Sequence, residues 1–229
     1  APRPDGARPR GVETKATTSG GTQPQTIIMG RYATGGNAVA PPMTHGKEGG
    51  DVVKFLNYVF DLSDFRITAV DWVYVDGEKQ RFAGGEEFYG VPATGTRFEG
   101  NAWLRWYDGT QTAADPMLTD IYDEYPRPWT PDHILTGVAY AVMTFKYDAE
   151  KFQGFPEMRF EVRGAPLYDP RRDDTAGGSG SQRWSDQDTW EYTENPAVMV
   201  YNILRGIELA DGSVYGLAVD ADDLPIGRW

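Results

Sequence analysis

The segment from Gly137 to Arg171 constrains the fold of this chain more than any other part. Residues 138–147 and 157–162 read as two alternating strands, because successive side chains of a β-strand point to opposite faces. An Arg-Gly turn and a Tyr-Asp-Pro-Arg loop follow. The segment therefore predicts scaffold, and it contains no pattern typical of chemistry.

Further strands are predicted upstream. Residues 52–60, 65–75 and 103–107 are rich in the β-branched and aromatic side chains that favour strands. Asp-Gly pairs, which are strong turn signals, follow two of these segments at 76–77 and 108–109. The region from 51 to 110 therefore predicts a β-meander with aromatic faces.

Helical signals are few. Residues 113–118 suit a short helical turn, and Thr130 is placed to cap another helix whose first residue is proline. The clearest helix covers 196–205, after the capping Asn195 and before Gly206. We predict a mainly β fold with minor α (α+β) and one clear helix near 196–205.

The chain divides into three parts. Residues 1–50 predict an extended N-terminal arm with a short strand at 26–32, since the first 25 residues carry almost nothing apolar to bury. Residues 51–164 predict a β-rich domain. Residues 165–229 predict a loop-helix-strand segment of an adjoining domain, including a polar Gly/Ser-rich loop at 173–188. We expect the chain to be part of a longer protein.

Composition excludes several kinds of site. The net charge is −12, from 34 acidic and 22 basic residues, so a broad phosphate-binding face is not expected. There are no cysteines and only two histidines, His45 and His133, which excludes disulfides and thiolate or multi-histidine metal sites. No apolar run approaches the roughly 20 residues of a membrane span, so we expect no stable membrane insertion.

Carboxylates cluster in one loop. Asp169, Asp173 and Asp174 lie close to Arg171 and Arg172. Two carboxyl groups at a defined separation in a cleft could hydrolyse a glycoside. We favour a solvated loop with local ion pairs.

Two other polar groups have a structural interpretation. Asp220, Asp222 and Asp223 could suggest calcium, but the glycine and the glutamate of the helix-loop-helix site are absent at the expected places. We favour an acidic turn. His133 beside Asp132 is expected to be a structural hydrogen-bonding group.

The aromatic residues of the predicted strands are the strongest competing signal. Trp72, Tyr74, Trp103, Trp106 and Tyr107 could stack on sugar rings. Aromatic pairs on one sheet face are also expected in a core or a subunit interface, which we favour. The chain has neither a Gly-x-Ser-x-Gly elbow nor a phosphate-binding loop. We therefore predict no catalytic, cofactor-binding or metal-binding residues, no cofactor and no enzymatic activity.

A series of short motifs is ordered along residues 26 to 225. They are Gly30-Arg31-Tyr32 with Gly35-Gly36, Ala113 to Pro116, Trp129 to His133, Gly137 to Tyr140, Tyr147-Asp148, Phe152, Gly154, Pro156, Val162 to Gly164, Leu167 to Arg171, Asn195 to Val198, Tyr215 to Leu217 and Asp223 to Pro225. In its order and spacing this series resembles the tail-tip attachment or central hub proteins of long-tailed, lambda-like phages and related gene transfer agents. The chain departs from the family in a Gly/Ser insertion around 175–181 and in its shorter length.

The resemblance implies a structural virion protein at the distal tail tip. Such hubs form a homotrimer that closes the tail tube, contacts the distal tail protein and the tape measure protein, and supports host attachment and DNA passage. Downstream domains would reach the host surface receptor. DNA would pass without specific binding, and the negative charge of the chain is compatible with this. The alternatives are a carbohydrate-binding or glycoside-acting β-domain and, third, a peptidoglycan-cleaving tip component.

Overall fold

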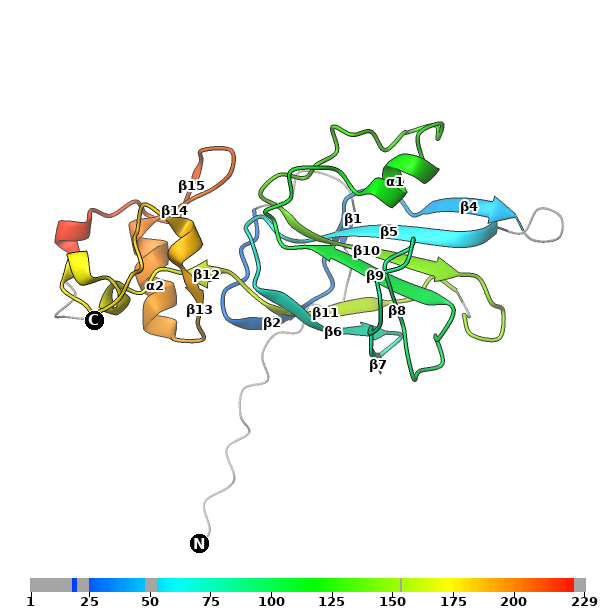
Figure 1. Cartoon of the computed structure of the whole chain (residues 1–229), viewed down its shortest axis with the longest axis horizontal. Coiled ribbons are helices and arrows are strands. Elements are labelled where there is room, and N and C mark those ends of the chain that lie inside the picture. Colours follow the sequence, from blue (N-terminus) through cyan, green and yellow to red (C-terminus); the bar gives the residue numbers. More distant parts are fainter. Residues whose placement is uncertain (1–17, 20–24, 48–52, 153, 225–229) are drawn as a thin grey trace, which may run out of the picture.

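The computed structural model describes residues 18–19, 25–47, 53–152 and 154–224. Over these residues the chain forms two stacked β-sheets and a smaller unit to one side that contains the longer helix (Figure 1). The predicted mainly β fold with minor α is confirmed.

The larger sheet has seven strands in the described part of the chain. Six follow the order β1-β3-β5-β10-β9-β8, and β4 pairs with β5 beside this path. The strands are β1 (Thr18–Ser19), β3 (Asn37–Ala38), β4 (Met43–Lys47), β5 (Val53–Ser63), β8 (Val91–Pro92), β9 (Ala102–Tyr107) and β10 (Ala139–Lys146). The antiparallel register places Val59 opposite Val142, and Leu104 opposite Met143.

The smaller sheet has the order β2-β11-β6-β7. Its strands are β2 (Arg31–Thr34), β6 (Ala69–Val75), β7 (Glu78–Gln80) and β11 (Met158–Arg163). Asp76 and Gly77 join β6 to β7 with φ of 50° and 77°. Two positive φ values in a two-residue loop match the right-handed twist of the strands, which explains the Asp-Gly hairpin signal.

The main core lies between the two sheets. β5 contributes Phe60, β10 contributes Met143 and Phe145, and β11 contributes Phe160 and Val162. The rings of Phe60 and Phe160 lie 5.3 Å apart across the layer. Alternate residues of each strand enter this core, as the two-residue periodicity requires.

A second core covers the opposite face of the larger sheet. Here α1 (Pro116–Ile121) and the chain after it pack on Val59, Tyr140 and Val142. Both faces of β5 and β10 are therefore buried.

A buried polar contact fixes α1 against the sheet. Asn57 donates to Thr144 Oγ1 at 2.6 Å and accepts from the Tyr122 hydroxyl at 2.7 Å. All three side chains are fully buried. Because an unpaired polar group would be costly there, these bonds select one placement of the helix.

The smaller unit follows residue 164. It contains β12 (Pro166–Leu167), β13 (Glu191–Tyr192), α2 (Pro196–Arg205), β14 (Ile207–Glu208), β15 (Val214–Tyr215) and four short 3-10 turns, η1 (Pro170–Arg172), η2 (Asp174–Ala176), η3 (Gln187–Thr189) and η4 (Ala221–Asp223). Its core gathers Leu167, Tyr168, Trp190, Val198, Tyr201 and Ile207.

The helix predicted near 196–205 is confirmed as α2. The Asn195 side chain accepts from the Ala197 N–H at 2.9 Å, and Gly206 ends the helix with a φ of 82°. Asn202, which is buried on the apolar face, donates to the Tyr168 carbonyl at 2.7 Å and ties α2 to β12.

Two sequence predictions about the sheets are wrong. The β-meander over 51–110 is split, because β5 pairs with β10 in one sheet and β6 pairs with β11 in the other. The strand expected at 26–32 lies further on, as β2. The Thr26 N–H donates to the Asp64 side chain at 2.7 Å and the Ile28 N–H donates to Ser63 Oγ at 3.3 Å, and within the described residues no strand is formed before Arg31 in this segment.

The helix start expected at Thr130 is also wrong. The His133 N–H donates to the Thr130 carbonyl at 3.0 Å and closes a single turn. Leu135 then has a φ of 57°, which is incompatible with a right-handed helix. The short helix expected at 113–118 is found three residues later, after Asp115 caps it.

Domain boundaries differ from those expected for the N-terminal arm. Strands β2, β3 and β4 pair with β11 and β5, so the part of the expected arm from residue 31 to 47 belongs to the sheets. Residues 1–17 and 20–24 of the expected arm lie outside the described residues. We propose a division after Gly164, where the buried residues change from the core between the sheets to a separate cluster.

Phe60→Ala should destabilise the protein by about 3–5 kcal/mol, because it empties a fully buried ring site in the main core. Urea unfolding followed by circular dichroism measures the change. Phe155→Ala is the matched control, since that ring is 76% exposed, and it should change stability by about 0.5 kcal/mol or less. Equal losses in the two variants would contradict the assignment of the core.

Asp61→Asn should stabilise the protein at pH 8 much more than at pH 4. Burial raises the pKa of Asp61 to about 7, the charge of Asp64 adds to this, and a hydrogen bond from Asn37 opposes it. The folded protein thus favours the protonated acid. That contribution is fully present below the ordinary pKa of 3.8 and is lost as the pH rises toward 7.

The asparagine has no charge to bury, so its gain at pH 8 should be on the order of 2 kcal/mol. Unfolding free energies of both proteins at the two pH values test this. A gain that is the same at pH 4 and pH 8 would show that folding does not shift the pKa of Asp61.

Candidate assembly surface

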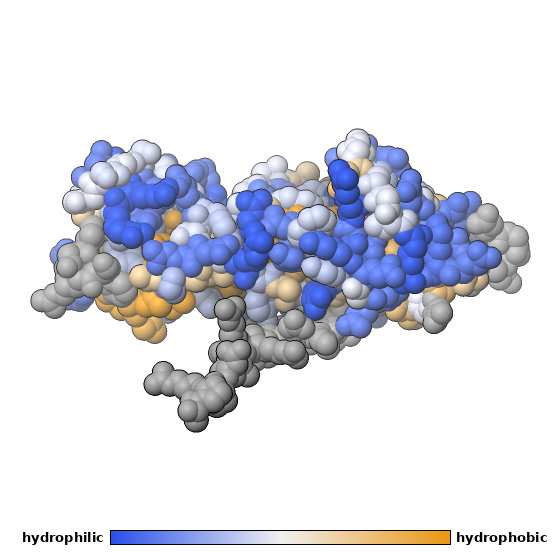
Figure 2. Space-filling model, turned by 90° about the horizontal axis from the view of Figure 1, so that it is seen from below, coloured by the Kyte–Doolittle hydropathy of each residue, from blue (hydrophilic) through white to orange (hydrophobic). Residues whose placement is uncertain are grey.

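The outer face of the smaller sheet is the candidate surface. Along β11, Met158, Phe160 and Val162 enter the core, so Arg159, Glu161 and Arg163 point outward. Figure 2 views the molecule from the side of this sheet, and hydrophilic residues predominate across it. We name this set the outer face. It also includes Arg31 of β2, Trp72 and Tyr74 of β6, and Lys79 of β7.

Aromatic side chains from β6 lie on the outer face beside cations. The register places Tyr74 opposite Arg159 and opposite Lys79, with Trp72 opposite Glu161. The Arg159 guanidinium lies 4.6 Å from the centre of the Tyr74 ring, and Lys79 Nζ lies 3.6 Å from the centre of the Trp72 ring. These are cation–π distances, so one face of each ring is covered by a cation.

Ion pairs join the strands of the outer face. Arg31 on β2 lies 3.3 Å from Asp71, 3.3 Å from Glu161 and 3.8 Å from Glu194. Arg163 lies 3.0 Å from Asp71. Exposed pairs contribute roughly 0–1 kcal/mol each, so they connect β2, β6 and β11 on this face without adding much stability.

The smaller unit extends the outer face. Arg163 lies 5.8 Å from the centre of the Tyr192 ring of β13, and the Tyr192 hydroxyl donates to Glu194 at 2.7 Å. Partial burial and this hydrogen bond raise the pKa of Tyr192, and Arg31 opposes the rise. The outer face therefore runs from the sheet onto the smaller unit.

A close backbone crossing connects the two parts. Gly164 donates to the Gly30 carbonyl and Ala165 donates to the Ile28 carbonyl, both at 2.7 Å. A Cβ at Gly164 would lie 2.1 Å from the Ile28 oxygen. The glycine is required for this approach, and the connection after β11 is not a loose linker.

A groove of about 750 Å³ lies between the sheets and the smaller unit. Arg66 and Gly137 line it from one side, and Trp184, Trp190 and Arg205 line it from the other. Arg66 pairs across it with Asp188 at 2.7 Å, and the Arg205 guanidinium lies 4.2 Å from the centre of the Trp184 ring. The cations that line the groove therefore already have partners.

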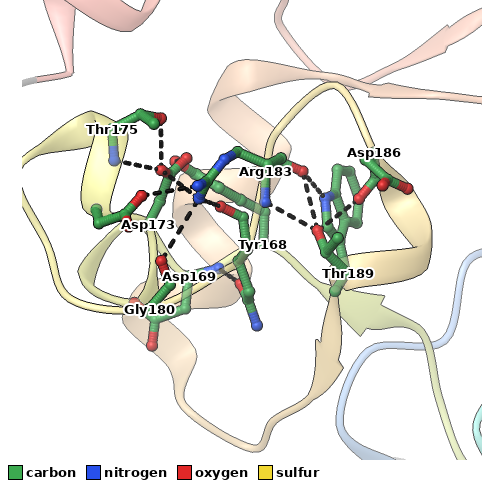
Figure 3. A network of polar contacts seen from close by, with 11 residues as sticks. Tyr168, Asp169, Asp173, Thr175, Gly180, Arg183, Asp186 and Thr189 are labelled. Atoms are coloured by element: carbon green, nitrogen blue, oxygen red, sulfur yellow. Dashed lines mark hydrogen bonds and ion pairs between the residues drawn. The ribbon is translucent and has the colours of Figure 1, made fainter.

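The carboxylate loop is largely exposed, as the sequence suggested, but two of its carboxylates, Asp169 and Asp173, are buried. Asp173 is 3% exposed and accepts from the Tyr168 hydroxyl at 2.7 Å, Thr175 N at 2.8 Å and Arg183 Nη1 at 3.1 Å (Figure 3). Burial alone would raise the pKa of Asp173, but the hydrogen bonds from Thr175 and Tyr168 and the charge of Arg183 hold that pKa below its usual value. Asp173 thus organises the loop from inside.

The other charged residues of the loop form local pairs, as expected. Asp169 binds Arg171 at 2.6 Å although it is largely buried, and Asp174 binds Arg183 at 2.7 Å. The hydrogen bond from Arg171 lowers the pKa of Asp169 against the opposing effect of burial. Arg172 pairs with Glu191.

Asp220 has a capping role. It accepts from Asp222 N at 3.1 Å and begins η4, and the side chains of Asp222 and Asp223 are exposed. Within the described residues no group of three or more metal-ligating side chains is found, and no helix is long and apolar enough to span a membrane.

Both histidines make structural contacts. His133 Nδ1 accepts from the Thr130 N–H at 2.9 Å, as expected of a structural hydrogen-bonding group. His45 lies 3.1 Å from the Tyr122 hydroxyl and stacks on Phe55 with ring centres 4.9 Å apart. Burial lowers the pKa of His45.

The aromatic residues of the strands separate into two groups. Trp103 is 8% exposed and donates to Glu87, Tyr107 donates to the buried Asp115, and Trp106 packs on the main core. Trp72 is 37% exposed, so the core interpretation does not apply to it.

The sequence interpretation missed the cations of the outer face. Arg31, Lys79, Arg159 and Arg163 come from three different strands. The alternation in β11 could have identified two of them. Arg31 and Lys79 can be placed on this face only when the pairing of β2 and β7 with their neighbours is known.

Comparisons with known proteins identify no family for this chain. No family model matches the chain, and no curated protein matches it. Among solved structures, the chain is similar to a chain of the structure titled "Virion of native gene transfer agent (GTA) particle", with 18% identity and a TM-score of 0.42. The similarity covers 82% of this chain and 40% of that chain. We base no assignment on a likeness this distant.

Gly164→Ala should destabilise the protein by about 3 kcal/mol or more, because the added Cβ has to displace the backbone of Ile28. Gly154→Ala is the matched control, since nothing lies within 4 Å of a Cβ there. Thermal and urea unfolding of both variants measure the effect. A mild effect in Gly164→Ala would mean that the crossing can open without loss.

Proposed function

We propose that this chain is a structural segment of the tail-tip hub of a phage-like particle, a phage or a gene transfer agent, with no catalytic role. The observation that carries the proposal is the outer face. Tryptophan, tyrosine and arginine are the residue types enriched in protein interfaces and in their most important positions. Here they occur together on one solvent-facing sheet of a chain that is otherwise strongly acidic.

Preorganisation supports the same proposal. Asp71 and Glu161 hold Arg31 in place, and Lys79 and Arg159 hold two aromatic rings. Ordering long side chains on association carries an entropic penalty. A face whose side chains are already ordered pays less of it and suits permanent assembly.

The assembly that we propose is a homotrimer in which the outer face contacts a neighbouring subunit. The distal tail protein, the tail tube and the tape measure protein would be its further partners in the particle. Downstream domains would reach the host receptor.

Charge suggests how the chain would be oriented around passing DNA. Four cations, Arg31, Lys79, Arg159 and Arg163, would retain phosphates if the outer face lined the channel. The segment from 120 to 132, which follows α1, carries Asp120, Asp123, Glu124 and Asp132 against one arginine. We therefore propose that the outer face is covered by protein and that the α1 side is nearer the channel.

A carbohydrate-binding role is the second candidate, because Trp72 is exposed on a sheet face. Stacking on a sugar requires an open ring face. Lys79 covers one face of Trp72 at 3.6 Å and Arg159 covers one face of Tyr74 at 4.6 Å. This arrangement favours a protein interface over a sugar platform.

Light scattering coupled to size-exclusion chromatography tests the proposal. The chain should give a particle with three times its mass of 25.5 kDa. Arg163→Glu should shift the population toward monomer, because it places a repelling charge beside Asp71 and Glu161. Arg127→Glu, a change of the same charge at an exposed position before the Trp129 segment, is the control and should leave the trimer intact.

Two outcomes would contradict the proposal. A protein that remains monomeric at high concentration and binds immobilised glycans would favour the carbohydrate-binding role. Turnover of cell-wall peptidoglycan by this chain would favour the third alternative.

A further inference from the structure

A groove opens where β6 extends past its neighbour β7. Strand β7 pairs only with residues 73–75 of β6, so residues 69–72 have no strand partner on that side among the described residues. After β7 the chain turns toward the larger sheet, where Phe82 bridges to Ala93. In Figure 1 β7 is visibly the shorter strand beside β6. The groove at this place has a volume of about 390 Å³.

Apolar side chains form much of the floor of the groove. Val70, Val73, Phe82, Leu104 and Trp106 line it, and all five belong to or border the main core. A volume of this size lies within the range of small-ligand sites and accommodates a large side chain.

One polar group in this floor has an unmet hydrogen-bonding requirement. Gln80 is 1% exposed, and its Nε2 donates to the Glu78 carbonyl at 2.9 Å. Its Oε1 is buried and has no hydrogen-bond partner in the described part of the chain. Buried amide oxygens are nearly always paired, so this one calls for a donor.

The rim carries a cation. Arg81 is exposed, lies at the mouth of the groove, and makes no ion pair within the described residues. Most other arginines near this sheet are paired with carboxylates. Arg81 is thus free to bind an acidic group.

We propose that this groove binds an extended peptide strand of a neighbouring protein. The strand adds to β6 beside Val70 to Trp72 and inserts a tryptophan or tyrosine side chain into the groove. The N–H or O–H of that side chain donates to Gln80 Oε1 after a small rotation of the carboxamide. An acidic residue of the strand pairs with Arg81.

Strand addition to a free edge gives affinity through backbone hydrogen bonds, and pockets for alternate side chains give specificity. The bulge at Asp71 interrupts the regular ladder of β6 with β11. A bulged edge is a poor template for indiscriminate pairing. Recognition at this edge therefore depends on the inserted side chain and on the charge.

A titration of ¹⁵N-labelled protein with the blocked peptide Thr-Val-Glu-Trp-Thr-Val-Thr tests the proposal by NMR. The backbone amides of residues 70–72 and the side-chain amide of Gln80 should shift. The same peptide with alanine in place of tryptophan should bind at least about tenfold more weakly. Absence of shifts at these positions up to about millimolar peptide, the weak end of specific binding, overturns the proposal.

Two variants separate binding from folding. Gln80→Leu should change the melting temperature little, since it removes an unpaired buried oxygen together with the hydrogen bond to the Glu78 carbonyl, and should weaken binding of the tryptophan peptide. Arg81→Glu, on the surface, should weaken binding of this glutamate-containing peptide, whereas Arg127→Glu should not. If Gln80→Leu does not fold, the pair of arginine variants decides the question.

Other outcomes count against the proposal. Shifts confined to the residues that line the larger groove beside Trp184 would place the peptide elsewhere. Binding of free N-acetyltryptophanamide without shifts at residues 70–72 would indicate a small-molecule pocket and not strand addition.

Discussion

Burial of both faces of the β5–β10 pair is the constraint on which the structure depends. Along β10, Ala141 and Met143 enter the core between the sheets, while Tyr140 and Val142 enter the core under α1. A shift of register by one residue would exchange these two sets. It would also separate Asn57 from its partners inside the second core. The two cores and the polar contact therefore specify the same register.

The smaller sheet differs because only one of its faces is buried. The larger sheet uses its two faces for folding, whereas the smaller sheet has a face available for other molecules. The ion pairs of Arg31 and Arg163 offset part of the positive charge there, which lowers the desolvation penalty of covering it with protein. The free edge of β6 belongs to the same sheet, so the proposed subunit contact and the proposed strand-binding groove are neighbours, and Trp72 borders both.

Much of the fold could be predicted from the sequence, and the limits have physical causes. Alternation identified β10 and β11, β-forming side chains identified β5, and the capping Asn195 identified α2, because these signals are local. The meander was wrong because the partners of β5 and β6 lie some 80 residues or more further along the chain. Asp173 was taken for a solvated residue because polar composition says nothing about how two consecutive 3-10 turns enclose a carboxylate. The outer face depends on the register of four strands and a bulge, which no single segment encodes.

The crossing at Gly164 also determines how the protein responds to mechanical load. A pull on the chain beyond residue 165 is resisted first by the bonds from Gly164 to Gly30 and from Ala165 to Ile28, and Arg31 beside them is tied to β6. Because these bonds sit at the end of the β2–β11 ladder, force applied there passes into the sheet and is shared among its strands. In the proposed tail-tip role, this short crossing would pass the pull of a tethered host into the sheet and not into a loose linker.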